Sequence, residues 1–235
     1  MKPFGIKKFE GILDFDIQHN VDIISSESGK ALYRQQLDIF KFDFDESEYK
    51  TIPNIFKEIG IEPHIPFSKR QLYKEFQSGI VAGAGFNDDC KDVLNNPNWK
   101  LYDLTDERDN VINKALGHEN SVAKFKKLDF SACDSLNRSE GGEEIEVISI
   151  DSLDFDYDFL SIDAEGLGCD ILCGAEISIL KNHPTILASV YHNWHEYLMI
   201  IPMLYDMGYE IDCIKTSSSS LQYPQSELAV IAKWS

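Results

Sequence analysis

The sequence predicts an α/β fold with a mainly parallel sheet, an antiparallel C-terminal hairpin and a small N-terminal cap. From Gly79 onward, short apolar segments alternate with helical ones, which is typical of α/β proteins. Two apolar segments, Phe159–Ile162 and residues 186–190, are separated by one helix-length connection. We therefore expect them to be neighbouring parallel strands of a βαβ unit. The last two apolar segments, residues 209–216 and Leu228–Trp234, are joined by a polar loop and predict the hairpin.

The N-terminal part of the chain has no regular alternation of strands and helices. Residues 40–45 alternate aromatic and charged side chains and predict a half-buried strand, and residues 55–59 predict a short helix. Residues 69–76 predict a helix that leads into the main domain. We expect residues 1–75 to form an irregular cap, serving either as a lid or as a contact in a homodimer, and residues 76–235 to form the main domain.

The elements of the main domain follow from periodicity and from helix boundary signals. In its first half we expect strands at residues 80–85, Trp99–Tyr102 and 123–128, with helices at residues 88–94 and 107–116, the second capped by Thr105 or Asp106. In its second half we expect strands at residues 146–150, Phe159–Ile162 and 186–190, a helix ending near His183, a helix at residues 194–207 closed by Gly208, and the terminal hairpin.

Composition and charge exclude several classes of protein. The chain has 235 residues, of which 40 are acidic and 22 are basic, for a formal net charge of −18. Such a charge repels phosphate backbones, so we expect no nucleic-acid partner. No apolar run reaches the roughly 18 residues of a transmembrane helix, and the first residues lack the apolar stretch of a secretion signal. We therefore expect no membrane span and a cytoplasmic location.

The five cysteines do not indicate a disulfide framework, because their number is odd and no secretion signal precedes them. Cys169 and Cys173 are four residues apart on a predicted helix and share one of its faces. They fit core packing better than a metal pair, since no second Cys or His cluster accompanies them.

Polar side chains follow the two parallel strands of the βαβ unit. Asp163 and Glu165 come after the first strand, and His192 and Asn193 come after the second. Ligands of open α/β sheets bind outside the carboxyl ends of the strands. The sequence therefore places Asp163, Glu165 and His192 where a substrate would bind.

A glycine corner, Gly83-Ala84-Gly85, ends the first strand of the main domain and predicts a cofactor site. The next strand ends at Asp103, and an acid about 20 residues after a glycine turn is the expected partner of ribose hydroxyls. The third strand ends at Asp129, next to Phe130. Together these residues predict an adenosine-bearing ligand, although Asp103 taken alone fits a helix cap or a solvated loop acid better than a ligand contact.

The acids beside the glycine corner favour one adenosine ligand over another. Asp88 and Asp89 follow the corner, where a dinucleotide would place its pyrophosphate, and the third glycine of the dinucleotide pattern is missing. S-adenosylmethionine carries a sulfonium and an ammonium cation and suits an acidic site better. An antiparallel terminal hairpin also argues against a nicotinamide-dependent dehydrogenase.

Several motifs together resemble the FkbM family of S-adenosylmethionine-dependent methyltransferases, over about residues 79 to 216. They are Ile150-Asp-Ser-Leu153, Asp158-Phe-Leu-Ser-Ile-Asp-Ala-Glu-Gly166, Ile171-Leu-Cys-Gly-Ala175, Pro184, Tyr191-His192 and Gly208-Tyr209. Two departures stand out: the chain has Ile80-Val-Ala-Gly-Ala-Gly85 where the family usually has an Asp-Val-Gly-Ala-Asn-x-Gly type motif, and Ser161 where it usually has lysine. The resemblance implies a class I methyltransferase (Rossmann-like) fold and O-methylation, often of sugars or polyketide-derived hydroxyls.

Two chemistries fit the predicted site. In the first, neutral His192 is the general base, and Asp163 or Glu165 orients its imidazole or binds substrate hydroxyls. In the second, Asp163, His192 and Asn193 bind Mg²⁺ or Mn²⁺, which lowers the pKa of a bound hydroxyl. Asp163 is also a candidate cofactor ligand. The alternatives are that the acids only cap the next helix, that His192 is structural, and that His195 is the base.

The function expected from these observations is S-adenosylmethionine-dependent O-methylation of a sugar hydroxyl. The acceptor would be a nucleotide-linked sugar or a precursor of a surface polysaccharide. The alternatives are a methyltransferase for a polyketide or another small molecule, and a binding module that keeps the fold without catalysis. A nicotinamide oxidoreductase is the least favoured alternative.

Overall fold

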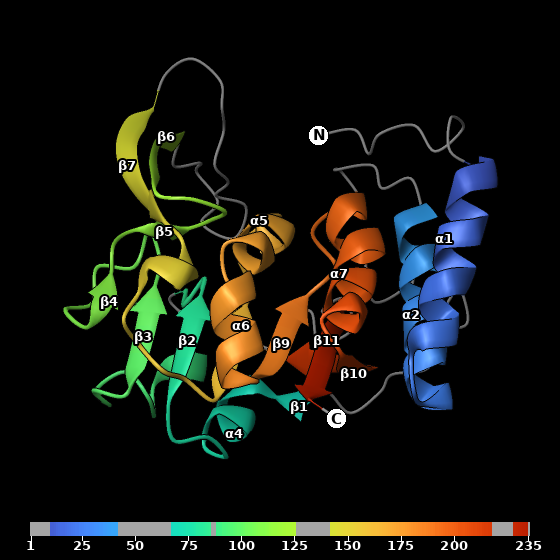
Figure 1. Ribbon diagram of the computed structural model, residues 1–235, viewed down its shortest axis with the longest axis horizontal. Coiled ribbons are helices and arrows are strands. Elements are labelled where there is room, and N and C mark those ends of the chain that lie inside the picture. The colour runs from blue at the N-terminus through green and yellow to red at the C-terminus, as the bar shows by residue number, and fades with distance from the viewer. Residues whose placement is uncertain (1–9, 42–66, 86–87, 126–141, 218–227, 235) are drawn as a thin grey trace, which may run out of the picture.

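The computed structural model describes residues 10–41, 67–85, 88–125, 142–217 and 228–234. The fold is α/β, with a mostly parallel central sheet and antiparallel C-terminal strands, as predicted (Figure 1). The strands are β1 (Phe67–Ser68), β2 (Gly79–Ala82), β3 (Trp99–Tyr102), β4 (Val111–Ile112), β5 (Ala115–Leu116), β6 (Ser121–Phe125), β7 (Glu143–Ile148), β8 (Phe159–Ile162), β9 (Thr185–Ser189), β10 (Tyr209–Ser217) and β11 (Leu228–Trp234). The helices are α1 (Glu10–Ile23), α2 (Glu27–Lys41), α4 (Lys69–Tyr73), α5 (Gly168–Cys173), α6 (Glu176–Asn182) and α7 (Trp194–Asp206).

The central sheet has the strand order β1-β10-β11-β9-β8-β2-β3-β4. Its middle strands β2 and β8 are buried along their whole length, because helices cover both faces of a parallel sheet and leave such strands no contact with water. The two strands pair in parallel, with Ile80 opposite Leu160 and Ala82 opposite Ile162. The predicted βαβ unit is present, since β9 pairs in parallel with β8.

The order of connections creates a switch point in the middle of the sheet. From β2 the chain continues to β3 and β4 on one side, and it later returns to β8 and β9 on the other side. At such a point the flanking connections leave on opposite faces and open a crevice at the carboxyl ends of the strands. In this protein the switch point lies where the glycine corner follows β2 and Asp163 follows β8, and we refer to this carboxyl edge of the sheet as the crevice.

The C-terminal hairpin is confirmed. β10 pairs with β11 in antiparallel register, and β11 is also antiparallel to β9. Gly208 ends α7 with a φ of 94°, in the left-handed region where glycine is favoured.

The prediction that the N-terminal segment is irregular is wrong for residues 10–41, which form the two helices α1 and α2. Ile17, Val21 and Tyr33 belong to the same hydrophobic core cluster as the strands. Figure 1 shows both helices beside α7, at the β10 side of the sheet. Phe40 and Lys41, where a strand was predicted, lie in α2, and the rest of that strand and the predicted helix at 55–59 fall outside the described residues. The division of the chain at residue 75 stays a prediction.

The predicted helix at residues 107–116 is also wrong, because two short strands, β4 and β5, take its place. The side chain of Asp103 accepts hydrogen bonds from the backbone N–H groups of Thr105 and Asp106 in a local turn, and the chain then pairs with β3 and β7 in place of a helix. Val111 pairs with Leu101 of β3 and is buried at the sheet edge.

The strand predicted at residues 123–128 belongs to a different sheet from the one expected. β6 pairs with β7 in antiparallel register in a small sheet of order β5-β7-β6, which Figure 1 shows at the side away from α1 and α2. The helix predicted at residues 88–94 is reduced to a 3-10 turn at Asp88–Cys90 followed by turns.

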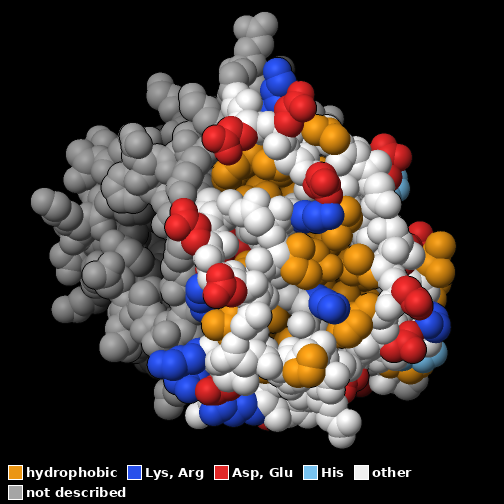
Figure 2. Space-filling model, turned by 90° about the vertical axis from the view of Figure 1, so that its left-hand side faces the viewer, with side chains coloured by type: hydrophobic (Ala, Val, Ile, Leu, Met, Phe, Trp, Pro, Cys, Tyr) orange, Lys and Arg blue, Asp and Glu red, His pale blue; other side chains and the backbone are white. Residues whose placement is uncertain are grey.

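The surface at the β4 end of the molecule is mixed in character. Figure 2 shows apolar side chains gathered in the middle of this face, with acidic and basic side chains among and around them. Among the described residues, no helix is both long and apolar enough to cross a membrane.

Candidate active site

The structure brings Asp163, Glu165 and His192 together at the carboxyl ends of β8 and β9. Nε2 of His192 lies 3.2 Å from Oδ1 of Asp163 and 3.9 Å from Oε1 of Glu165. The parallel pairing of β8 with β9 explains this proximity, because both strands deliver their last residues to the same edge. Sequence spacing alone predicted this grouping.

His192 is held between carboxylates on both sides of its ring. Nδ1 lies 2.9 Å from Oε2 of Glu196, one turn further along α7, while Nε2 faces Asp163. Nε2 is buried and close enough to Oδ1 of Asp163 for an ion pair, but the angle between these atoms does not meet the geometry of a hydrogen bond. A neutral imidazole would direct a lone pair at one of the two carboxylates. The doubly protonated imidazolium therefore fits this geometry best.

The surroundings of His192 do not favour the neutral ring that was expected of a general base. Burial disfavours the imidazolium, but the carboxylates of Asp163 and Glu196 outweigh it and raise the pKa of His192 to about 10. The expected general base needed a neutral ring at neutral pH. Because both ring nitrogens then carry a proton, His192 has no lone pair to accept one, and it fits the role of a fixed cation that orients the acids around it.

Asp163 is paired with a lysine that the sequence analysis missed. Nζ of Lys69, the first residue of α4, lies 2.5 Å from Oδ2 of Asp163, and its side chain is buried. The hydroxyl of Tyr191 donates to Oδ1 at 3.2 Å. Burial opposes ionisation of Asp163, but Lys69 and His192 hold the pKa of its carboxyl well below its usual range. The ion pair joins residues far apart in the chain, so no spacing pattern reveals it.

Glu165 is the most exposed of the three site carboxylates. Its side chain is 36% exposed, against 22% for Asp163 and 1% for Glu196. Its backbone is left-handed, with a φ of 43°, and it is followed by Gly166 with a φ of 95°. Left-handed backbone costs free energy for a residue other than glycine, and such strain concentrates at functional sites. The turn thus places a carboxylate at the mouth of the crevice.

Asn193 has a structural role in α7. Its side-chain oxygen accepts a hydrogen bond of 2.8 Å from the backbone N–H of Glu196, which makes it the N-cap of the helix. Its side-chain nitrogen lies 3.5 Å from the carbonyl oxygen of Gly166. Together these bonds fix the start of α7 against the turn after β8.

The residues present do not fit the predicted metal site of Asp163, His192 and Asn193. The ammonium of Lys69 already occupies the side of Asp163 where a cation would bind, and a metal ligand must present a deprotonated nitrogen, which His192 does not. Asn193 uses its oxygen to cap α7. Among the described residues, no group of three or more His, Cys, Asp or Glu side chains is arranged to hold a metal ion.

The glycine corner is shaped by the neighbouring strand. Gly83 and Gly85 have φ values of 79° and 56°. A Cβ atom on Gly83 would lie 2.0 Å from the carbonyl oxygen of Asp163, so only glycine allows β2 and β8 to approach so closely at their ends. Ala84 is buried, and its N–H donates to the carbonyl of Tyr102 at 3.1 Å. The corner therefore places backbone directly beside Asp163.

Asp103 is occupied largely by its own loop. Oδ2 accepts a hydrogen bond of 2.8 Å from the N–H of Gly85, and Oδ1 accepts from Thr105 and Asp106. Arg108 adds a cation here, donating to the carbonyl of Gly85 at 2.5 Å and pairing with the buried Asp106. Asp103 thus shapes the corner from the β3 side, beside the position expected for a ribose. The other predicted cofactor residues, Asp129 and Phe130, lie outside the described residues.

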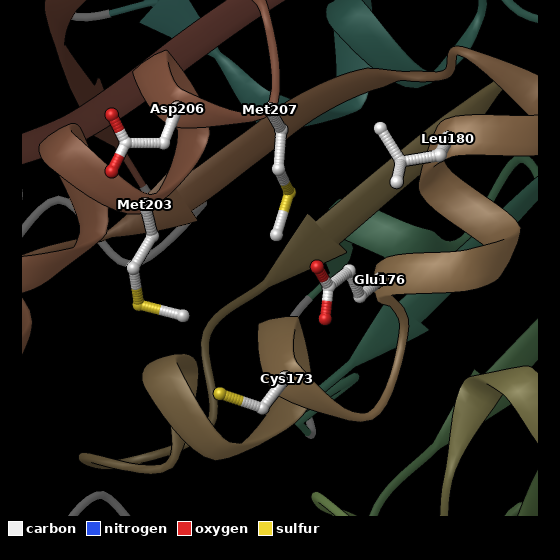
Figure 3. Close-up of a pocket in the computed structure, with 6 residues that line it drawn as sticks. All are labelled: Cys173, Glu176, Leu180, Met203, Asp206 and Met207. Carbon is white, nitrogen blue, oxygen red and sulfur yellow. The ribbon is translucent and has the colours of Figure 1, made fainter.

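The remaining candidates lie apart from this cluster. His195 is exposed on α7, whereas His192 is nearly enclosed. Cys169 is buried and Cys173 is exposed, and both are free thiols. Cys173 lines a pocket of about 280 Å³ between α5, α6 and α7, shown in Figure 3, together with Glu176, Leu180, Met203, Asp206 and Met207. None of the predicted site residues lines this pocket.

Comparisons with known proteins bear on the family and the fold of the chain. Residues 59–211 match the model of the methyltransferase FkbM domain. The crystal structure of a methyltransferase FkbM from Methylobacillus flagellatus KT is similar, with a TM-score of 0.59 and 14% sequence identity. The similarity covers 92% of this chain and 58% of that one, so this chain spans somewhat more than half of that protein's length. No curated protein matches the sequence. Because the domain model matches more than half of its residues, the chain belongs to the FkbM family of methyltransferases.

Proposed function

We propose that this protein is an S-adenosylmethionine-dependent O-methyltransferase that acts on a sugar hydroxyl. The observation that carries the proposal is the cluster of Asp163, Glu165 and His192 beside the glycine corner, at the switch point of a methyltransferase fold. One side of the crevice then serves the cofactor, and the other side serves the acceptor.

The cofactor side fits S-adenosylmethionine by its backbone shape and its charge. Gly83, Ala84 and Gly85 form a corner without bulky side chains at the end of β2, and the carboxylates of Asp103 and Asp163 lie beside it. When bound there, S-adenosylmethionine supplies a methyl group activated by a sulfonium cation. An acidic surrounding stabilises such a cation by charge attraction.

The acceptor side must orient a hydroxyl and remove its proton as the new bond forms. Asp163 is engaged by Lys69 and His192, and His192 already carries both protons. We therefore assign proton removal to Glu165, whose carboxylate is more exposed than those of Asp163 and Glu196. His192 and Asp163 hold the surrounding charges in place.

A sugar acceptor is supported by the kinds of side chain at the rim. Carboxylates accept hydrogen bonds from neighbouring hydroxyl groups, and the partly exposed aromatic rings of Tyr191 and Trp194 offer faces for a sugar ring. Nucleotide-linked sugars and surface-polysaccharide precursors are the acceptors we favour. A polyketide hydroxyl is the alternative within the same chemistry.

Calorimetry with the purified protein tests the cofactor, and mass spectrometry tests the acceptor. We expect S-adenosylmethionine and S-adenosylhomocysteine to bind with similar affinity, while NAD does not. A screen of nucleotide sugars, neutral oligosaccharides and polyketide alcohols should show a gain of one methyl group in a sugar. Absence of binding by both cofactor forms would overturn the proposal.

A second candidate function is a binding module without catalysis. It is favoured because structural contacts alone account for the residues of the glycine corner. Gly83 is required by its contact with Asp163, and Asp103 is engaged by its own loop, so both have structural reasons to be present. Under this alternative the cofactor binds, but no acceptor is methylated. Substitution of Glu165 by Gln then leaves the biological output unchanged.

A further inference from the structure

We propose that Lys69 is a positioning residue of the candidate active site, which from α4 holds the Asp163 carboxylate so that Asp163 in turn holds Nε2 of His192. The inference rests on the proposed function, which places Asp163 and His192 beside the cofactor and the acceptor. Lys69 comes from the segment ahead of β2, and the residue patterns assigned no role to it.

Helix α4 is docked along strand β8 at two points. The hydroxyl of Tyr73 lies 3.0 Å from the hydroxyl of Ser161, and the ammonium of Lys69 lies 2.5 Å from Asp163. Four residues of a helix rise about 6 Å, and two residues of a strand rise about 6.6 Å, so the two contacts match in spacing. The buried Tyr73–Ser161 contact therefore sets the register that delivers Lys69 to the end of β8.

The start of α4 is fixed from the other side by the sheet itself. Phe67 of β1 pairs with Thr216 at the end of β10, and Ser68 caps α4 by accepting from the N–H of Gln71. Lys69 follows directly, so the backbone that carries it is tied to the edge of the central sheet. Its ammonium reaches Asp163 from a rigid base, which is what a positioning residue requires.

Stability alone does not explain a buried lysine at this place. Lys69 is 4% exposed, and its partner Asp163 is largely enclosed. A buried ion pair recovers little more than the cost of removing both charges from water, and apolar replacements are often as stable. What the pair does supply is one fixed orientation of the carboxylate, with Oδ2 on Lys69 and Oδ1 toward Tyr191 and His192.

The test follows the ring nitrogens of His192 by NMR in protein labelled with ¹⁵N-histidine. Lys69→Met should shift the Nε2 signal more than the Nδ1 signal, because Nε2 faces Asp163 whereas Nδ1 faces Glu196. Lys69→Arg, which keeps the charge, should restore the wild-type pattern. An unchanged Nε2 signal, or equal changes at both nitrogens, would overturn the inference.

Arg70→Met is the matched control. It removes a cation from the next position of α4. There Nε of Arg70 lies 2.7 Å from Oδ2 of Asp92, and this pair does not involve Asp163. We expect no change in either ring nitrogen of His192. If Lys69→Met does not fold, Lys69→Gln carries the same comparison. If both fail to fold while Lys69→Arg folds normally, Lys69 is needed for structure and the positioning role is rejected.

Binding of S-adenosylhomocysteine provides a second measurement that separates the two proposals. We expect folded Lys69→Met to bind it at least about tenfold more weakly than the wild type, a difference of about 1.4 kcal/mol. If the wild type does not bind at all, the proposed function fails, while the NMR comparison still decides the role of Lys69. If wild type and variant bind equally, the positioning role fails and the proposed function stands.

Discussion

Two carboxylates from different elements decide the charge of His192. Asp163 ends β8 and Glu196 lies in the first turn of α7, and they approach opposite nitrogens of the ring. His192 was recognised as a site residue from its position after a strand, but its protonation state depends on Glu196, which no motif singled out. A histidine with two carboxylate neighbours behaves as a cation, and one without them behaves as a base.

The raised pKa of His192 makes protein stability depend on pH. A folded-state pKa of about 10, above the ordinary value of 6.5, means that the imidazolium stabilises the folded state fully below about pH 6.5. This contribution is lost as the pH rises toward about 10. We expect the free energy of unfolding, measured by urea denaturation, to fall more over this range in the wild type than in His192→Gln.

His118→Gln is the control for this pH dependence, since His118 is exposed. It should give the same pH profile as the wild type. Parallel profiles for the wild type and His192→Gln would show that the ring does not carry the extra proton in the folded protein.

Glu165 is expected to carry the proton transfer. Glu165→Gln keeps the size and most hydrogen bonds of the side chain but removes its basicity. The turnover rate should fall at least about 10²-fold, with the affinity for S-adenosylhomocysteine unchanged. Glu176→Gln, on α6 in the separate pocket, is the matched control and should retain full activity. An active Glu165→Gln enzyme would return the role of base to His192.

At the scale of elements, helix α7 links the site to the N-terminal helices. Its cap residue Asn193 and the buried Glu196 border the crevice, and one residue further on Tyr197 stacks on Tyr33 of α2 with ring centres 4.2 Å apart. The two tyrosines also exchange hydrogen bonds, each hydroxyl donating to the other's carbonyl at 2.9 and 2.8 Å. The N-terminal helices therefore brace the element that carries Glu196.

Removing one hydroxyl from this pair tests the brace. Tyr33→Phe deletes the donor to Tyr197 and leaves Asn20, which donates to the Tyr33 hydroxyl at 2.7 Å, without that partner. A buried group that loses its partner costs about 1 to 3 kcal/mol, so the free energy of unfolding should fall by that amount. Tyr205→Phe, at an exposed tyrosine of α7, should change it little. Equal effects would argue against the brace.

The contact between the ends of β2 and β8 can be tested at Gly83. Gly83→Ala combines a left-handed backbone with a Cβ that would overlap the carbonyl of Asp163. Gly208→Ala has the same backbone problem but meets only the Trp234 ring, at 3.4 Å or more. We expect losses in unfolding free energy of about 1 to 2 kcal/mol for Gly208→Ala and more than about 3 kcal/mol for Gly83→Ala. Similar losses would mean that β2 can move away from β8.

At the scale of the whole molecule, the dominant property is the net charge of −18. Repulsion among so many like charges opposes the compact state, and salt weakens this repulsion. The thermal midpoint should rise as NaCl increases from about 0.01 to about 0.15 M, where the Debye length falls from about 30 to about 8 Å. Sucrose at equal osmolality controls for non-ionic effects. A midpoint that is independent of salt would mean that the acids are neutralised locally.

Much of the fold could be predicted from the sequence because the strands of a parallel sheet have a strong local signature. Phe159–Ile162 is fully buried and apolar at three of its four positions, and the sheet, the hairpin and the βαβ unit followed from such segments. Segments whose structure depends on distant partners were predicted wrongly. Residues 107–116 form β4 and β5, which are held by pairing with β3 and β7, and α1 and α2 pack against α7 and β10, more than 150 residues away in the chain.

The sequence by itself determined the α/β class, the family and the edge of the sheet at which Asp163, Glu165 and His192 meet. These follow from local patterns and from the rule that parallel strands end at one edge. The tertiary structure alone decided their chemistry. It brought Lys69 and Glu196 against Asp163 and His192, excluded water from the pairs, and left Glu165 at the mouth. Charge depends on neighbours and burial, and these exist only once the chain is folded.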